Sequence, residues 1–276
     1  MNGLIEAAVR RGMPLVALGA ALGVASAASA TTYPPQSWNG WHWAHTGNLD
    51  IMIGDNVGSA WDTYLRRAAS LWSKDKYVDF SVTSGRTSPG TCAPVYGTVQ
   101  ACNANYGQTG WLGYATVWTS GSYIVQATVK LNDYYFAQPR YNTTAYRNLV
   151  SCQEVGHTIG LAHIDVNYTN LNLGTCMDYT NDPTGTKGTN GTKANISPSG
   201  VDFTNLDRIY AKFDSTQLTY TKPGYKTGEA FGLPGSEDIE SATVPVPEPS
   251  SWAMMIGGFA LVGMAARRRK AIPAAA

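Results

Sequence analysis

The residues best suited to chemistry lie in one stretch of the chain, residues 152–179. It contains a glutamate, Glu154, and two histidines, His157 and His163. Imidazole nitrogens are common zinc ligands, and a carboxylate beside a metal can take a proton from water without binding the ion. The stretch therefore predicts a site for metal-assisted hydrolysis.

The first part of this stretch has the spacing of a helix. Gln153 and His157 are four positions apart, so on a helix they project from one face about one turn apart. A single helix can supply two ligands to a tetrahedral zinc ion in this way. Gly160 can adopt the left-handed conformation that ends a helix, and the chain can then turn and bring His163 to the same ion.

This pattern resembles the long HExxHxxGxxH signature of the metzincin zinc metallopeptidases, in which a turn containing methionine follows. The resemblance implies that His157 and His163 are zinc ligands, that Glu154 is the general base and that Gly160 is the turn glycine. It also implies that Met177, in the sequence Cys-Met-Asp-Tyr, is the Met-turn residue beneath the metal.

The sequence departs from that signature at a ligand position, because Gln153 stands where the pattern has histidine. Glutamine can bind zinc through its amide oxygen, although it is a weaker, neutral donor. Three interpretations remain open. Gln153 is the third ligand, or Asp165, His42 or His45 takes that role, or metal binding is lost and the fold survives as a binding domain. The first of these is our prediction.

All four cysteines lie in the part of the chain that we expect to be exported. An even number of cysteines in an oxidising compartment is typical of disulfides. Three pairings are possible, and we predict the two local ones, Cys92 with Cys102 and Cys152 with Cys176. A zinc site made of four cysteines is disfavoured, because the sequence has no CxxC spacing.

Apolar residues recur with the period of strands or of helices along the rest of the domain. Ser59 is predicted to cap the first helix, and residues 85–110 are predicted to form a long loop pinned by the first disulfide. The predicted strands are residues 49–53, 78–82, 114–119 and 123–131, and the predicted helices are residues 60–72, 144–160 and 201–213.

The order of these elements is similar to that of the N-terminal subdomain of the metzincins. The resemblance implies an α+β fold in which a mixed, twisted sheet packs on two main helices, with the active-site helix followed by the Met-turn. We expect the folded domain to span residues 31–223. Residues 224–246 contain few large apolar side chains and are predicted to be a linker.

Both ends of the chain look like processing signals. Residues 1–30 combine two arginines, a short apolar run and an Ala-x-Ala site, as in a secretory signal peptide. Residues 247–276 combine Pro-Glu-Pro, an apolar run and a basic cluster, and closely resemble the PEP-CTERM sorting signal of Gram-negative bacteria. The resemblance implies cleavage by an exosortase, so that the apolar run is only transiently a transmembrane helix in the inner membrane. A permanent anchor is the alternative.

The charge and composition of the chain argue against one class of function, nucleic-acid binding. The formal net charge is +1, only 14% of residues are charged, and no basic patch with interleaved aromatics occurs, which argues against nucleic-acid binding. We predict an exported zinc metalloendopeptidase at the cell surface or in the extracellular matrix. It would hydrolyse peptide bonds with a metal-activated water, with the substrate extended along an edge strand of the hairpin. The alternative is a catalytically degenerate surface or matrix protein that binds protein or polysaccharide.

Overall fold

The computed structural model of the protein describes residues 36–187, 190–211, 225–232 and 244–245. The expected signal peptide, residues 1–30, and the expected C-terminal sorting segment, residues 247–276, lie outside these residues.

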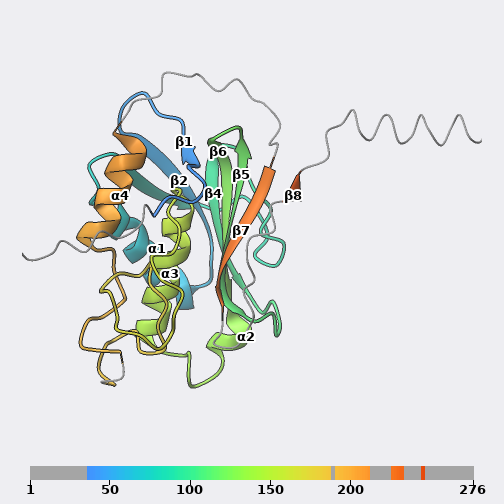
Figure 1. Cartoon of the computed structure of the whole chain (residues 1–276). Coiled ribbons are helices and arrows are strands. Elements are labelled where there is room, and N and C mark those ends of the chain that lie inside the picture. The colour runs from blue at the N-terminus through green and yellow to red at the C-terminus, as the bar shows by residue number, and fades with distance from the viewer. Residues whose placement is uncertain (1–35, 188–189, 212–224, 233–243, 246–276) are drawn as a thin grey trace, which may run out of the picture. The chain divides into compact units, whose positions relative to one another are not determined.

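The strands form one mixed sheet with the order β3-β2-β4-β6-β5-β7-β8, and β1 pairs with β6 off this path (Figure 1). Strands β3, β2, β4 and β6 run parallel to one another, whereas β5 is antiparallel to both β6 and β7. The strands are β1 (His42–Trp43), β2 (Leu49–Asn56), β3 (Val78–Ser84), β4 (Thr98–Ala104), β5 (Trp111–Ser120), β6 (Tyr123–Asn132), β7 (Tyr225–Gly232) and β8 (Val244–Pro245).

Two helices of 14 residues each, α1 and α3, pack against each other and against the sheet (Figure 1). Fully buried Trp61, Trp72 and Leu149 contribute to the core between these layers. The Trp72 indole also donates a 2.8 Å hydrogen bond to the carbonyl of Cys152, which ties α1 to the start of the motif. The helices are α1 (Ser59–Trp72), α2 (Asp133–Phe136), α3 (Thr144–His157) and α4 (Gly200–Tyr210).

This architecture agrees with the expected α+β class and with a mixed sheet on two main helices. It differs from the sequence prediction at several elements. The loop predicted over residues 85–110 contains β4, whose residues Thr98 to Cys102 are all buried. Because β4 lies inside the sheet and is covered on both faces, its sequence lacks the alternation that marks a half-exposed strand.

Smaller differences occur at the helix ends and after α4. Gly58, not Ser59, is the N-cap of α1, and α3 ends at His157, three residues before Gly160. The connection after β6 includes the short helix α2, whose first turn is capped by the side chain of Asn132. The stretch predicted as a linker contains β7 and β8, which extend the sheet.

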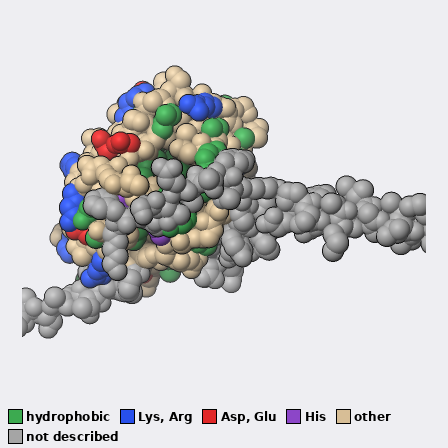
Figure 2. Space-filling model, turned by 90° about the horizontal axis from the view of Figure 1, so that it is seen from above, with side chains coloured by type: hydrophobic (Ala, Val, Ile, Leu, Met, Phe, Trp, Pro, Cys, Tyr) green, Lys and Arg blue, Asp and Glu red, His purple; other side chains and the backbone are tan. Residues whose placement is uncertain are grey.

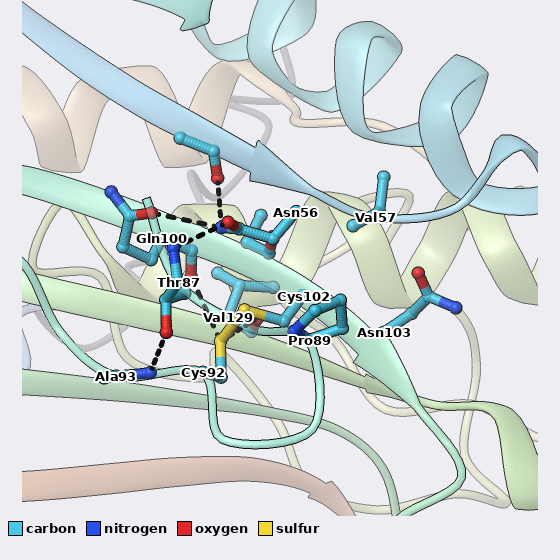
Figure 3. The surroundings of a disulfide bond; sticks show 12 residues. Asn56, Val57, Thr87, Pro89, Cys92, Ala93, Gln100, Cys102, Asn103 and Val129 are labelled. Atoms are coloured by element: carbon cyan, nitrogen blue, oxygen red, sulfur yellow. Dashed lines mark hydrogen bonds between the residues drawn. A yellow bond between two sulfur atoms is a disulfide. The ribbon is translucent and has the colours of Figure 1, made fainter. Parts of the chain in front are cut away.

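The structure contains both expected disulfides, Cys92 with Cys102 and Cys152 with Cys176. Figure 3 shows the first, which joins the loop before β4 to the strand itself. Beside it, the Asn56 side chain donates to Gln100 Oε1 at 3.0 Å and accepts from Thr87 N at 3.0 Å. The loop is therefore held to the sheet by covalent and polar contacts.

The surface is poor in charge. Figure 2 shows a face on which uncharged polar side chains and backbone atoms predominate, with scattered Lys, Arg, Asp and Glu side chains. This agrees with the low charged fraction of the sequence.

Candidate metal centre

Helix α3 carries the first half of the motif through the core. Thr143 caps its start by accepting a hydrogen bond from Tyr146 N at 3.2 Å. Gln153, Glu154 and His157 are all completely buried on this helix. Polar side chains are rarely buried unless they are paired or functional, so three in five residues mark this turn as a site.

The two motif histidines meet. His157 Nε2 lies 2.9 Å from His163 Nε2. The other ring nitrogen of His157, Nδ1, lies 2.8 Å from the carbonyl oxygen of Leu161. Because a carbonyl can only accept, this contact places a proton on Nδ1 of His157, while its Nε2 faces His163. Metal-binding histidines are usually oriented by such a contact at their second nitrogen.

A sharp turn after α3 returns His163 to the helix. Gly160 has φ +87°, and a Cβ at this position would lie 2.1 Å from the carbonyl oxygen of Trp41, so glycine is required. Trp38 N donates to the Gly160 carbonyl at 2.8 Å, and the Tyr210 hydroxyl donates to the Ile159 carbonyl at 2.9 Å. Burial raises the pKa of Tyr210, so its hydroxyl keeps the proton that it donates.

Gln153 has one amide atom engaged and one that is not. Its Nε2 donates to the carbonyl of Cys176 at 2.8 Å. Its Oε1 is buried and accepts no hydrogen bond from the described residues. A buried polar atom in this condition calls for an explanation such as an ion. Oε1 is also the atom through which a glutamine binds zinc, so Gln153 has a donor atom available for a metal ion.

Glu154 lies against the backbone of β5. A Cβ on Gly113 would be only 2.6 Å from Glu154 Oε1 and 2.5 Å from Val150 Cγ1. Glycine at this position of β5 therefore allows the strand to pass close to the carboxylate. The sequence analysis did not identify Gly113, because its role depends on contact between elements about 40 residues apart.

The Met segment packs beneath the helix. Met177 is fully buried, and a Cβ on Gly156 of α3 would lie 2.7 Å from its Sδ, so the helix and the methionine are in close contact. The backbone carbonyl of Met177 accepts from Ile164 N at 2.8 Å, which joins the segment to the chain just after His163. The disulfide between Cys152 and Cys176 ties the same segment to α3.

Among the alternative third ligands, His42 is the first residue of β1 and His45 follows that strand. Their rings contact the rings of Tyr123 and Tyr210, with centroid separations of 5.2 and 5.4 Å respectively. The Asp165 carboxylate accepts from Asn167 N at 2.6 Å and from the Asn170 amide.

No group of three or more His, Cys, Asp or Glu side chains is placed to hold a metal ion within the part of the chain that the structure describes. The amide oxygen of Gln153 is a donor of another type.

Asp178, next to Met177, is a buried carboxyl group. Its Oδ2 accepts from Leu173 N at 2.9 Å and from Asn195 Nδ2 at 2.6 Å. Burial raises the pKa of Asp178 from 3.8 to about 6. The Asp178 carboxyl group thus joins the Met segment to Leu173 before it and to Asn195 in the loop after it.

Comparison with known proteins identifies the C-terminal tail. Residues 245–270 match the PEP-CTERM protein-sorting motif, which confirms the prediction made from the tail. The protein is therefore exported, processed by an exosortase, and located at the cell surface or outside the cell after removal of the signal. No curated protein matches the chain. No helix among the described residues is long and apolar enough to cross a membrane.

Proposed function

We propose that the protein is an exported zinc-dependent peptidase in which Gln153, His157 and His163 hold the metal and Glu154 is the general base. One observation carries the proposal. His157 Nε2 and His163 Nε2 lie 2.9 Å apart, and Gln153, one helical turn away, has a buried Oε1 that accepts no hydrogen bond from the described residues. The resemblance to the metzincin signature and the Met segment beneath α3 support the same assignment.

Two of the three proposed ligands, His157 and Gln153, are oriented by backbone carbonyls. The Leu161 carbonyl fixes the His157 ring so that Nε2 offers its lone pair, and the Cys176 carbonyl fixes the Gln153 amide so that Oε1 points away from that contact. Such second contacts reduce the motion of ligands and keep them in the binding tautomer. Because Cys176 is also bonded to Cys152, the orienting carbonyl is held to the same helix as the ligand.

Zinc, when bound, supplies a Lewis acid that polarises the scissile carbonyl and lowers the pKa of water. Glu154 takes a proton from the water as the water oxygen attacks the carbonyl carbon. Glu154 then passes the proton to the amide nitrogen as the carbon–nitrogen bond breaks, which leaves a carboxylic acid and an amine; the acid loses its proton to the amine at neutral pH. The close approach of β5 to Glu154 at Gly113 means that a peptide laid along β5 would pass beside this carboxylate.

A second candidate function follows from the neutral ligand. Gln153 is a weaker donor than the histidine of the metzincin signature, so a site of low zinc occupancy would leave a scaffold that only binds peptides. The sorting motif at residues 245–270 agrees with either function, because it directs export and not chemistry.

The deciding experiment combines metal analysis with an assay of peptide hydrolysis on the purified full chain. We expect one zinc per chain, and we expect Glu154→Gln to retain zinc but to lose hydrolysis of an unstructured protein by at least about a hundredfold. Asp50→Asn, the same chemical change at an exposed position of β2, is the matched control and should leave activity unchanged. Hydrolysis that survives in Glu154→Gln would refute the proposed role.

A further inference from the structure

The outer edge of β5 is not open. Strand β7 pairs with it in antiparallel register from Thr119 opposite Tyr225 to Trp111 opposite Gly232, which covers almost the whole of β5 (Figure 1). Strand β7 follows α4 in the chain and comes from the stretch that its composition predicts to be a linker.

Strand β7 also lies at the candidate metal centre. Gly113, the residue that allows β5 to approach Glu154, pairs with Phe231, and the register shifts between Trp111 and Gly113 at this place. Strand β7 contacts α3 as well as β5. Its backbone therefore runs where the proposed function places the backbone of an extended peptide substrate.

We propose that β7 is an intramolecular occupant of the peptide-binding edge of β5, so that a substrate binds only after β7 is displaced; the identity of the excluded ligand rests on the proposed function. An added strand binds a sheet edge through main-chain hydrogen bonds. A segment of the same chain and a substrate therefore compete for the same backbone donors and acceptors of β5.

The sequence of β7 suits displacement. It reads Tyr-Lys-Thr-Gly-Glu-Ala-Phe-Gly, with two glycines and two charged residues, and such residues are depleted in stable strands. Only Tyr225 and Lys226 pair with β8 on the other side, so most of its outer edge has no neighbouring strand among the described residues. An edge strand of this kind holds its place mainly because it is tethered.

The tether sets the size of the effect. A tethered segment has an effective concentration in the millimolar range. If a free peptide of the same sequence binds the open edge with a Kd of about 100 µM, displacement of β7 lowers its apparent Kd by about tenfold.

The test uses proline pairs in the full chain. In an antiparallel ladder, alternate residues of β7 direct their N–H groups to β5 and the others direct them away. Thr227→Pro with Glu229→Pro and Gly228→Pro with Ala230→Pro therefore remove different sets of donors, and each double variant is the control for the other. The readouts are hydrogen exchange of residues 112–119 and binding of a fluorescent peptide with the sequence of residues 225–232.

We expect one double variant to speed exchange along β5 and to bind the peptide about tenfold more tightly than the unmodified chain, while the other does neither. In the unmodified chain, amides of β5 and β7 that face each other should exchange at the same protected rate. Rapid exchange of β5 in the unmodified chain, or equal peptide binding by both variants and the unmodified chain, would overturn the occupancy of the edge. Hydrogen exchange of the unmodified chain tests the proposal even if neither double variant folds.

Hydrolysis of an unstructured protein separates this occupancy from the proposed function. Peptide binding that increases without any hydrolysis supports the occupied edge and counts against the peptidase. Hydrolysis at the same rate in the unmodified chain and in both double variants supports the peptidase and overturns the proposal that β7 must be displaced before a substrate binds.

Discussion

Replacing Gln153 by leucine is the sharpest test of the metal centre, because the two side chains have similar size and differ in polar atoms. In the metal-free protein two effects oppose each other. Loss of the Nε2 contact deprives the buried Cys176 carbonyl of a donor, which costs about 1–3 kcal/mol, while removal of the buried Oε1 returns a similar amount. The free energy of unfolding without zinc should therefore change by less than about 1 kcal/mol.

With zinc the two proteins should differ clearly. Loss of an orienting contact alone typically costs 10- to 100-fold in metal affinity, so loss of a ligand should raise the zinc Kd by at least about 100-fold. At saturating zinc this removes about 2.7 kcal/mol of stabilisation, which corresponds to about 5–10 °C in the midpoint of thermal unfolding for a domain of this size.

The assay compares thermal unfolding in chelator and in excess zinc and measures the zinc Kd by competition with a fluorescent chelator. Gln126→Leu, the same substitution at a half-buried position of β6, serves as the control and should keep the zinc response of the unmodified protein. Gln153→His should move the zinc Kd in the opposite direction to Gln153→Leu. A Gln153→Leu variant with an unchanged zinc Kd would refute the assignment of Gln153 as a ligand.

Three further outcomes follow from described contacts. Gly113→Ala places a Cβ 2.6 Å from Glu154 Oε1, so hydrolysis should fall at least about tenfold while zinc content stays the same, as kinetics and metal analysis would show. Gly160→Ala combines φ +87° with a Cβ 2.1 Å from the Trp41 carbonyl oxygen, so urea unfolding should show a loss of about 3 kcal/mol or more. Burial raises the pKa of Asp178 from 3.8 to about 6, because it disfavours the charged carboxylate in the folded state. The free energy of unfolding should therefore fall by about 1–2 kcal/mol as pH rises from 4 to 7. Urea titrations at pH 4 and pH 7 should show a smaller difference for Asp178→Asn than for the unmodified protein.

The motif was predictable because its geometry is local. A four-residue spacing on a helix and one glycine after it determine where three side chains can project, whatever the rest of the chain does. The structure accordingly brings His157 next to His163 and places Gln153 on the same helix. Roles for zinc and for Glu154 as a base remain predictions, since they concern chemistry and not the placement of atoms.

The parts that sequence reasoning missed depend on contacts between distant elements. Strand β4 has no alternating pattern because it is buried on both faces between neighbouring strands. Strand β7 has the composition of a linker, and its pairing with β5 is what makes it a strand. Gly113 could be recognised only once β5 was known to pass beside α3. A glycine directly before the predicted strand of residues 114–119 was the available signal.

The short strand β8 joins the folded sheet to the sorting signal. Its residue Pro245 pairs with Tyr225 of β7 and is also the first residue of the PEP-CTERM match. A pull on the tail during secretion would load this antiparallel pair at its open end, where hydrogen bonds break one after another and not all together. A force on the tail would therefore act first on the pairing of β8 with β7 and then on the pairing of β7 with β5. Single-molecule stretching of the chain can measure the force at which these strands separate.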